Sequence, residues 1–355
     1  MNQHRVWTCR PYRPGDEIHL APLFSRVFER TMTPESWRWK LGHRTYTVAN
    51  SWLAVDSRDR PVCHYAGIPR RVRLAAGERD VMVAVDAMTA PEFRRQGAYT
   101  AVVTRAHEAW RDAGVAFVLG MPNEQHGSRI VALGWQRVAS LRWMIRPLRP
   151  DLLLARRVRL ARLPGLEAAS ELWNRGWDFG ARRSYGQVPR AADRAESEVA
   201  FAHLGAARPS QDRLALQRDK AWLVHRLLDP PESPYEIVIA GDAEGPLGYA
   251  AFRLREVNGR KIGAIAELAS STGDDRIGAA LISEAANRLR RQGAEIAIAL
   301  AVPGGRDERL FRRRGFLFSW GEFGVHAVVL DAEVGIETLS GSERWRLTGS
   351  DFDVV

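Results

Sequence analysis

The stretch APEFRRQGAYTAVV, residues 90–103, marks the point where a strand pattern gives way to a helix pattern. The residues before it, VMVAVDAM, form an apolar run, and the apolar residues after it recur at helical spacing as far as Gly114. The first turn of such a helix leaves backbone N–H groups without intrahelical partners and carries partial positive charge. Gly97 lets a ligand approach these donors, and Arg94 and Arg95 add charge that can meet phosphate. The junction therefore suits a pyrophosphate group.

The composition is that of a globular protein with room for two domains. The chain has 355 residues, of which 45% are hydrophobic and 26% are charged. Lys and Arg outnumber Asp and Glu by 52 to 42, which fits either general arginine enrichment or a partner that carries phosphate. Because no stretch reaches the length of a membrane span and the amino terminus has no apolar signal segment, we expect a cytoplasmic protein. Cys9 and Cys63 lie in no metal-binding or disulfide pattern.

Two helices and a meander of strands precede the junction. Asp16 can cap a helix over residues 17–30, and TPESWRWK is typical of a second short helix. Strand patterns follow at SWLAVD, VCHYAGI, RVRLAA and VMVAVDAM. After the junction helix, VAFVLGM is typical of a buried strand, residues 126–132 of a helix, and GWQRVASLRWMIRPL of a strand. This order predicts a mixed sheet flanked by helices.

The second half of the chain repeats this order, which indicates an internal duplication of about 120 residues. VMVAVDAM matches IGAIAELA, YTAVVTRAHEAWRDAG matches GAALISEAANRLRRQG, VAFVLGM matches AEIAIAL, and IVALGW matches LFRRRGF. We therefore predict the α+β class, with two domains that each contain a mixed, mostly antiparallel central sheet flanked by helices. The predicted boundaries are 1–148 for the N-terminal domain, 149–219 for a connecting helical and loop segment, 220–335 for the C-terminal domain and 336–355 for a tail.

The order of elements and the turn at the junction resemble the GNAT superfamily of acyl-CoA-dependent N-acyltransferases. The turn of that superfamily follows Arg/Gln-x-x-Gly-x-Gly/Ala; Arg94 and Gly97 match it, whereas Tyr99 stands where a small residue is usual. The resemblance covers the first domain and, through the repeat, most of the chain, which is similar to tandem GNAT proteins. It implies two GNAT-like domains in an enzyme that uses acetyl-CoA or another acyl-CoA as co-substrate, and no metal is expected.

The resemblance also implies positions for the cofactor. The pyrophosphate would be held by the side chains of Arg94 and Arg95 and by the backbone amides of Gln96, Gly97, Ala98, Tyr99 and Thr100. Backbone groups of Ala87, Met88 and Thr89 would pair with the pantetheine arm as with an extra strand. Asn123 could reach the cofactor or the acyl carbonyl, or it could cap the next turn.

The second copy of the junction lacks these features. When the two helices are aligned, Gly273 stands at the arginine position and Arg276 at the central glycine, with Asp274 and Asp275 between them. Aspartates repel phosphate, so we expect only the first domain to bind the cofactor. The second domain would then shape the substrate pocket or hold the assembly together.

An amine must lose a proton before it can attack a thioester, so such an enzyme needs a proton acceptor. In many GNAT enzymes this is a carboxylate on the strand before the phosphate turn, a position that Asp86 occupies here and that lies near Glu267 in the second copy. The usual proton donor, a tyrosine, is replaced in the two copies by Ile130 and Phe311. The substitutes by proximity are Tyr99 and His126, although for His126 a solvent-facing position in a loop is the favoured interpretation.

The leading hypothesis is an N-acetyltransferase that moves an acyl group from coenzyme A to a primary amine of a small molecule. WRWK and HYAGIP are expected to flank the acceptor site, unless their aromatic side chains belong to the core. The run RDKAWLVHRLLDPPESPYEIVIA and the ending WRLTGSDFD resemble tandem GNAT proteins associated with bacterial surface-polysaccharide genes, which makes an amino sugar one candidate acceptor. An antibiotic-like amine and a protein lysine are others.

Two other functional classes remain open at this stage. A Fem-type aminoacyl-tRNA-dependent transferase uses the same doubled fold and would suit a basic chain, but the intact turn favours coenzyme A, and we do not expect nucleic acid as a partner. A non-catalytic GNAT-fold binding protein could contact a membrane surface through LLLARRVRLARL, although packing of that stripe on the domains is favoured.

Overall fold

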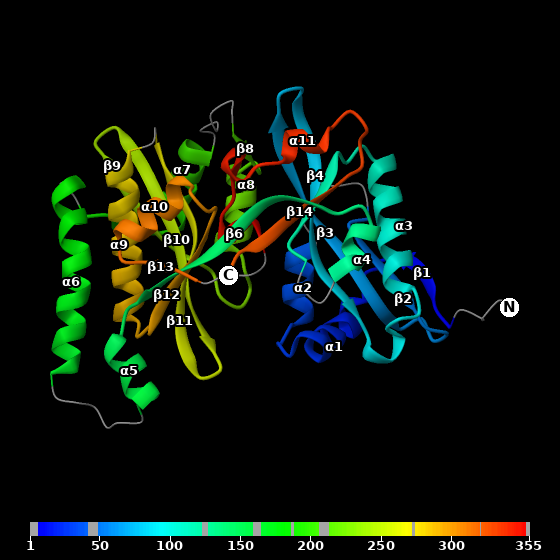
Figure 1. Ribbon diagram of the computed structural model, residues 1–355, viewed down its shortest axis with the longest axis horizontal. Helices are drawn as coiled ribbons and strands as arrows, with labels where there is room; N and C mark the ends of the chain where they lie inside the picture. The colour runs from blue at the N-terminus through cyan, green and yellow to red at the C-terminus, as the bar shows by residue number, and fades with distance from the viewer. Residues whose placement is uncertain are drawn as a thin grey trace. The chain divides into compact units, whose positions relative to one another are not determined.

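The computed structural model describes residues 6–41, 49–122, 127–158, 165–185, 188–205, 213–271, 274–319 and 321–352. The chain divides into two compact units (Figure 1). Unit 1 comprises Met1–Ala139 and Gly324–Gly341, and unit 2 comprises Ser140–Phe323 and Ser342–Val355. This division differs from the boundaries expected from the repeat, because Gly324–Gly341 belong with the N-terminal unit.

Unit 1 contains a mixed sheet in the order β1-β2-β3-β4-β5-β14. All neighbouring strands are antiparallel except β4 and β5, which pair in parallel. The strands are β1 (Thr8–Pro11), β2 (Ser51–Val55), β3 (Pro61–Leu74), β4 (Gly77–Thr89), β5 (Phe117–Gly120), β14 (Phe323–Val329) and the start of β6 (Gln136–Pro147). The helices are α1 (Glu17–Phe28), α2 (Pro34–Leu41), α3 (Ala98–Asp112), α4 (Gly127–Ala132) and α11 (Ile336–Leu339).

The core of unit 1 forms because the helices carry apolar side chains on one face. Leu20 and Phe24 of α1, Trp37 of α2, and Val102 and Trp110 of α3 are buried in one cluster with side chains of the sheet. Their spacing of three to four residues, or multiples of it, is the amphipathic pattern of the sequence. The helix and strand assignments around residues 90–103 therefore follow from hydrophobic periodicity.

Unit 2 contains a second mixed sheet, in the order β6-β12-β11-β10-β9-β7, with β13 also pairing with β6. Strands β11 and β12 are parallel, like β4 and β5. The strands are β7 (Arg190–Ala192), β8 (Leu214–Ala215), β9 (Glu236–Asp242), β10 (Gly245–Val257), β11 (Arg260–Ser270), β12 (Ile296–Ala301), β13 (Leu317–Phe318) and β15 (Trp345–Arg346). The helices are α5 (Pro150–Val158), α6 (Leu166–Tyr185), α7 (Arg194–Gly205), α8 (Lys220–Leu223), α9 (Asp275–Arg291) and α10 (Arg306–Arg313), and α6 packs beside α9 (Figure 1).

The predicted α+β class with mixed, mostly antiparallel sheets flanked by helices is confirmed. The segment 180–196, expected to be loop, instead contains the end of α6, strand β7 and the start of α7. The residues of β7 pair with β9, so neighbouring strands override the polar composition of that segment. None of the helices in the described residues combines the length and the apolarity that crossing a bilayer requires.

Strand β14 completes the sheet of unit 1, although it follows the last helix of the repeat in unit 2. It pairs antiparallel with β5, from Val329 opposite Phe117 to His326 opposite Gly120. In unit 2, residues 142–147 of β6 pair antiparallel with β12. Each sheet therefore includes a strand that the linear repeat assigns to the other copy.

Candidate functional site

The junction between β4 and α3 is an exposed turn with two left-handed residues. After a short 3-10 turn (Pro91–Phe93), Arg95 has φ +63° and Gly97 has φ +80°, and α3 begins at Ala98. Arg94, Arg95 and Gly97 are exposed. The backbone conformation favours glycine at residue 97. A Cβ built there would meet no heavy atom within 4 Å of the described structure, so the space in front of the helix is open.

The amino-terminal end of α3 is suited to an anion. Among the described residues, no side chain caps this 15-residue helix by a hydrogen bond, and its first turn contains no acidic residue. The side chain of Gln96 donates to the Glu92 carbonyl (2.8 Å) and Arg94 Nε to the Thr89 carbonyl (3.3 Å), which ties the turn together. The first-turn N–H groups, the helix dipole and the arginines together leave positive charge at an accessible surface.

The corresponding end of α9 in unit 2 already holds carboxylates. Asp274 is the N-cap residue, and its side chain accepts a hydrogen bond from the Arg276 backbone N–H (2.8 Å). Asp275 accepts hydrogen bonds from Arg306 (3.0 Å) and Arg313 (3.1 Å). These carboxylates already bind the N–H group and the arginine side chains that a phosphate would need, so this end of α9 does not suit an anion.

Among the described residues, no strand pairs with the edge of β4 next to the turn once β5 has ended. The parallel pairing between β4 and β5 ends where Val83 lies opposite Leu119, and β5 ends one residue later at Gly120. Strand β4 continues six residues further, from 84 to Thr89. Backbone groups on that edge can pair with an extended ligand. Ala87, Met88 and Thr89, the residues expected to bind the pantetheine arm, all lie in this extension.

A β-bulge interrupts β4 within the extension. Asp86 and Ala87 together lie opposite Tyr65 of β3, since His64 pairs with Met88 and Ala66 with Val85. Asp86 has φ +50°, a left-handed conformation. An extra residue of this kind bends a strand and changes which backbone groups face its edge.

The side chain of Asp86 has a buried structural partner. Lys40 Nζ lies 2.8 Å from Asp86 Oδ1, and these side chains are only 2% and 8% exposed. An aspartate in so apolar a strand needs either a partner or a catalytic function. The ion pair with Lys40 supplies the partner. The burial of Asp86 by itself does not indicate catalysis.

His64 holds the backbone at the bulge. Its Nδ1–H donates to the Asp86 carbonyl (2.8 Å), so Nε2 is the acceptor for the Ser51 hydroxyl (2.8 Å). The ring is fully buried and packs edge-on against Trp37, with centroids 4.8 Å apart. Burial, assisted by the charge of Lys40, lowers the pKa of His64 to about 4. The imidazole is thus neutral near pH 7.

Of the other two residues expected to act in catalysis, the structure describes Tyr99. Its ring lies edge-on to Tyr65 with centroids 6.4 Å apart, and burial raises the pKa of its hydroxyl to about 12. Near neutrality Tyr99 is therefore a proton donor and not an acceptor. Asn123 and His126 lie outside the described residues. Ile130, at the usual tyrosine position, packs against the core of unit 1.

Strand β14 adds a histidine that sequence reasoning missed. His326 lies opposite Gly120, the last residue of β5, where β4 and β5 part. Its Nδ1–H donates to the Gly324 carbonyl (3.1 Å), which leaves Nε2 as a proton acceptor. Burial lowers the pKa of His326, and the charge of Arg137 acts in the same direction. No local motif marks this residue, because the repeat places it in the other domain.

In unit 2 the place that matches the open edge is filled by the C-terminal segment. The pairing of β11 with β12 ends at Ile265 and Ala299, while β11 continues to Ser270. A 3-10 turn at Gly349–Asp351 packs against both strands. Arg346 donates to the Leu268 carbonyl (2.8 Å), a backbone group on this extension of β11.

Glu267 anchors this segment. Its buried carboxylate accepts hydrogen bonds from Arg218 (2.9 Å) and Thr348 (2.7 Å) and also from Ser350. Arg218 in turn lies 2.5 Å from Asp351. Glu267, which the repeat aligns with Asp86, is thus part of an internal network.

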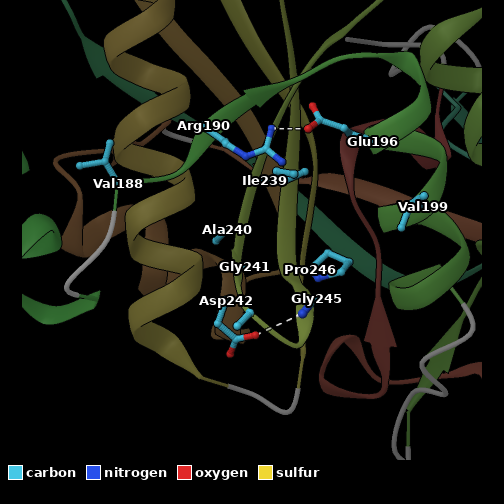
Figure 2. A pocket seen from close by; sticks show the side chains of 11 residues that line it. Val188, Arg190, Glu196, Val199, Ile239, Ala240, Gly241, Asp242, Gly245 and Pro246 are labelled. Atoms are coloured by element: carbon cyan, nitrogen blue, oxygen red, sulfur yellow. Dashed lines mark hydrogen bonds and ion pairs between the residues drawn. The ribbon is translucent and has the colours of Figure 1, made fainter.

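Of the described cavities, one in unit 1 adjoins the arginine turn, and the others lie in unit 2. A cavity of about 390 Å³ in unit 2 lies between the β9–β10 hairpin, β7 and α7 (Figure 2). The Arg190–Glu196 ion pair (2.6 Å) and the Asp242 side chain border it. A cavity of about 300 Å³ in unit 1 lies beside α1 and includes Glu92 and Phe93, directly before the arginine turn. Among the described residues, no group of three or more His, Cys, Asp or Glu side chains could hold a metal ion.

Comparison with known proteins finds a family match in the N-terminal part of the chain. Residues 8–137 match the family model of the acetyltransferase (GNAT) domain. This segment of unit 1 is thus similar to a GNAT domain. The matched segment includes β4, the arginine turn and α3. No curated protein matches the chain.

Solved structures resemble most of the chain. A probable N-acyltransferase of unknown function from Enterococcus faecalis V583 is 13% identical, with a TM-score of 0.64 over 91% of this chain and 73% of that one. A GCN5-related N-acetyltransferase from Anabaena variabilis ATCC 29413 is 12% identical, with a TM-score of 0.62 and coverages of 92% and 73%. Saccharomyces cerevisiae N-myristoyltransferase with bound myristoylCoA is 12% identical, with a TM-score of 0.63 and coverages of 92% and 84%. At these identities the similarity establishes the fold.

Proposed function

We propose that the protein is an acyl-CoA-dependent N-acyltransferase whose single cofactor site lies in the GNAT-like domain of unit 1. The observation that carries the proposal is the uncapped N-terminus of α3, with Arg94, Arg95 and an open space at Gly97, next to the free edge of β4. A pyrophosphate would meet the helix N–H groups, and an amide-rich arm would lie along residues 84–89. Unit 2 holds its own carboxylates and C-terminal segment at the matching places.

For the chemistry, we propose His326 as an acceptor for the proton of the amine. The neutral imidazole with a free Nε2 suits this role, since a general base must be unprotonated at the working pH. Tyr99 remains the candidate donor for the departing thiolate, because its hydroxyl keeps its proton near neutrality. Asp86 remains a candidate base only if its carboxylate leaves Lys40 and binds the substrate amine instead.

For the substrates, we propose acetyl-CoA as the donor and the primary amine of a small molecule as the acceptor, with an amino sugar of surface-polysaccharide synthesis as a candidate. The acetyltransferase description of the matching family model supports the donor. The C-terminal run that resembles tandem GNAT proteins is the ground for the acceptor.

Titration calorimetry with acetyl-CoA tests the cofactor site. We expect one molecule bound per chain, and we expect Gly97→Glu to abolish binding because a carboxylate would enter the phosphate position. Arg276→Glu, at the matching position of the α9 turn, is the control and should bind as the wild type does. A wild-type protein that shows no binding of acetyl-CoA would refute the proposal.

A further inference from the structure

The bulge in β4 places Asp86 in a backbone conformation that residues other than glycine rarely adopt. Asp86 has φ +50°, and a residue other than glycine keeps such an angle only when its surroundings hold it there. Aspartate tolerates the left-handed region better than most residues, whereas a β-branched residue does not. The bulge must therefore be stabilised by contacts outside β4.

Three elements supply these contacts. Lys40 of α2 binds the Asp86 carboxylate at 2.8 Å, and His64 of β3 donates to the Asp86 carbonyl at 2.8 Å. Ser51 of β2 occupies the other ring nitrogen of His64. These side chains are buried, so water does not compete for the same bonds. One group thus holds the side chain of Asp86, and another holds its backbone.

The position of the bulge decides which backbone groups β4 presents along its open edge. Successive residues of a strand face opposite ways, so one extra residue reverses the alternation of every group beyond it. Asp86 lies in the extension of β4 past β5, between the end of the parallel pairing at Val83 and the arginine turn. Removing the bulge would therefore change the edge at residues 87–89 without altering the N-terminus of α3.

We infer that Lys40, His64 and Ser51 are positioning residues that hold the bulge at Asp86 and so set the β4 edge for the pantetheine arm of the acyl-CoA. This inference rests on the proposed function. It gives the Lys40–Asp86 pair a role in ligand binding that does not require Asp86 to move a proton. It also divides the cofactor site into two parts, because binding of the pantetheine arm depends on the bulge, whereas binding of the phosphates depends on the N-terminus of α3.

The test compares two ligands in four proteins by calorimetry. Acetyl-CoA carries the arm, and adenosine 3′-phosphate 5′-diphosphate carries the same phosphates without it. The proteins are the wild type, Lys40→Met, and the double variants Lys40→Met/Asp86→Gly and Lys40→Met/Asp86→Val. Both double variants lack the ion pair and the carboxylate, and they differ in that glycine adopts a positive φ freely while valine resists it.

We expect Lys40→Met to weaken acetyl-CoA binding at least about tenfold while nucleotide binding changes less than about twofold, since only the strained residue loses its support. Asp86→Gly in the Lys40→Met protein should restore acetyl-CoA binding, and Asp86→Val should not. An unchanged acetyl-CoA affinity in Lys40→Met, a parallel loss of both ligands, or equal behaviour of the two double variants would overturn the inference. Failure of the wild type to bind either ligand would instead remove the proposed function.

Discussion

Two buried histidines should make unit 1 unstable in mild acid, and His107→Gln isolates one of them. His107 of α3 shares a 3.0 Å hydrogen bond with the Tyr65 hydroxyl and packs against Trp110 and Trp135. Burial lowers the pKa of His107 from 6.5 to about 4, and the charge of Arg111 acts in the same direction. Glutamine keeps a polar partner for Tyr65 but does not titrate.

The magnitude follows from proton linkage. Between pH 6.5 and 4 the unfolded chain binds more protons than the folded chain, so the free energy of unfolding falls as the pH falls. At pH 4.5 the imidazole is about 99% protonated in the unfolded state and about one quarter protonated in the folded state. Protonation therefore raises the unfolding equilibrium constant about 77-fold at pH 4.5, which corresponds to a loss of about 2.5 kcal/mol in the free energy of unfolding. Almost none of this loss is present at pH 7.

Urea unfolding followed by tryptophan fluorescence at pH 7 and pH 4.5 measures this loss. The wild type should lose about 2.5 kcal/mol more than His107→Gln between the two pH values, after the difference between the proteins at pH 7 is subtracted. Because His64 also has its pKa lowered to about 4, the variant should keep the remaining acid sensitivity. Equal losses in both proteins would show that His107 is protonated in the folded state without cost, which would refute the reasoning.

Three further outcomes follow from the structure. His326→Gln should leave acetyl-CoA affinity unchanged but lower the rate of transfer to an amine that is protonated at pH 7, while transfer to hydroxylamine, which is neutral at pH 7, should persist; loss of both rates would argue against a role as base. Arg218→Met should destabilise unit 2 by about 3–5 kcal/mol, because it leaves Glu267 and Asp351 buried without this partner, and a thermal midpoint equal to that of the wild type would contradict this. Gly120→Ala should destabilise unit 1 by about 1–3 kcal/mol in denaturant titrations, since its Cβ would lie 2.9 Å from the Trp135 ring, whereas Gly114→Ala, a control with no neighbour within 4 Å, should show only backbone strain.

Local patterns were enough to predict the elements around the arginine turn. The helix expected from Ala98 to Gly114 is observed as Ala98–Asp112, and the strand expected at VMVAVDAM lies within Gly77–Thr89. Hydrophobic periodicity decides such elements because each buries one face. Asp16 does stand before α1, but its carboxylate binds Arg10 (2.7 Å) and does not cap the helix. A choice between two partners for one carboxylate depends on tertiary contacts.

The candidate site was only partly predictable for the same reason. The turn at Gly97 carries its own signal, because the backbone there requires glycine and the arginines are adjacent in sequence. The bulge at Asp86 carries none, since it depends on Lys40 and His64 from other elements. His326 could not be placed by aligning the two halves, because the exchange of strands between sheets is a property of the whole chain.

The exchange of strands has a consequence for synthesis on the ribosome. Domains generally fold in order as they emerge, with the N-terminal one first. Here β5 gains its second neighbour, β14, only when residues 323–329 have been made, after nearly all of unit 2. Until then, the nascent unit 1 exposes the unpaired edge of a buried strand, the kind of surface that invites aggregation or chaperone binding. A fragment that ends at residue 148 would remain in that state permanently, so the N-terminal unit cannot be obtained as a native module by cutting the chain at the end of the first repeat.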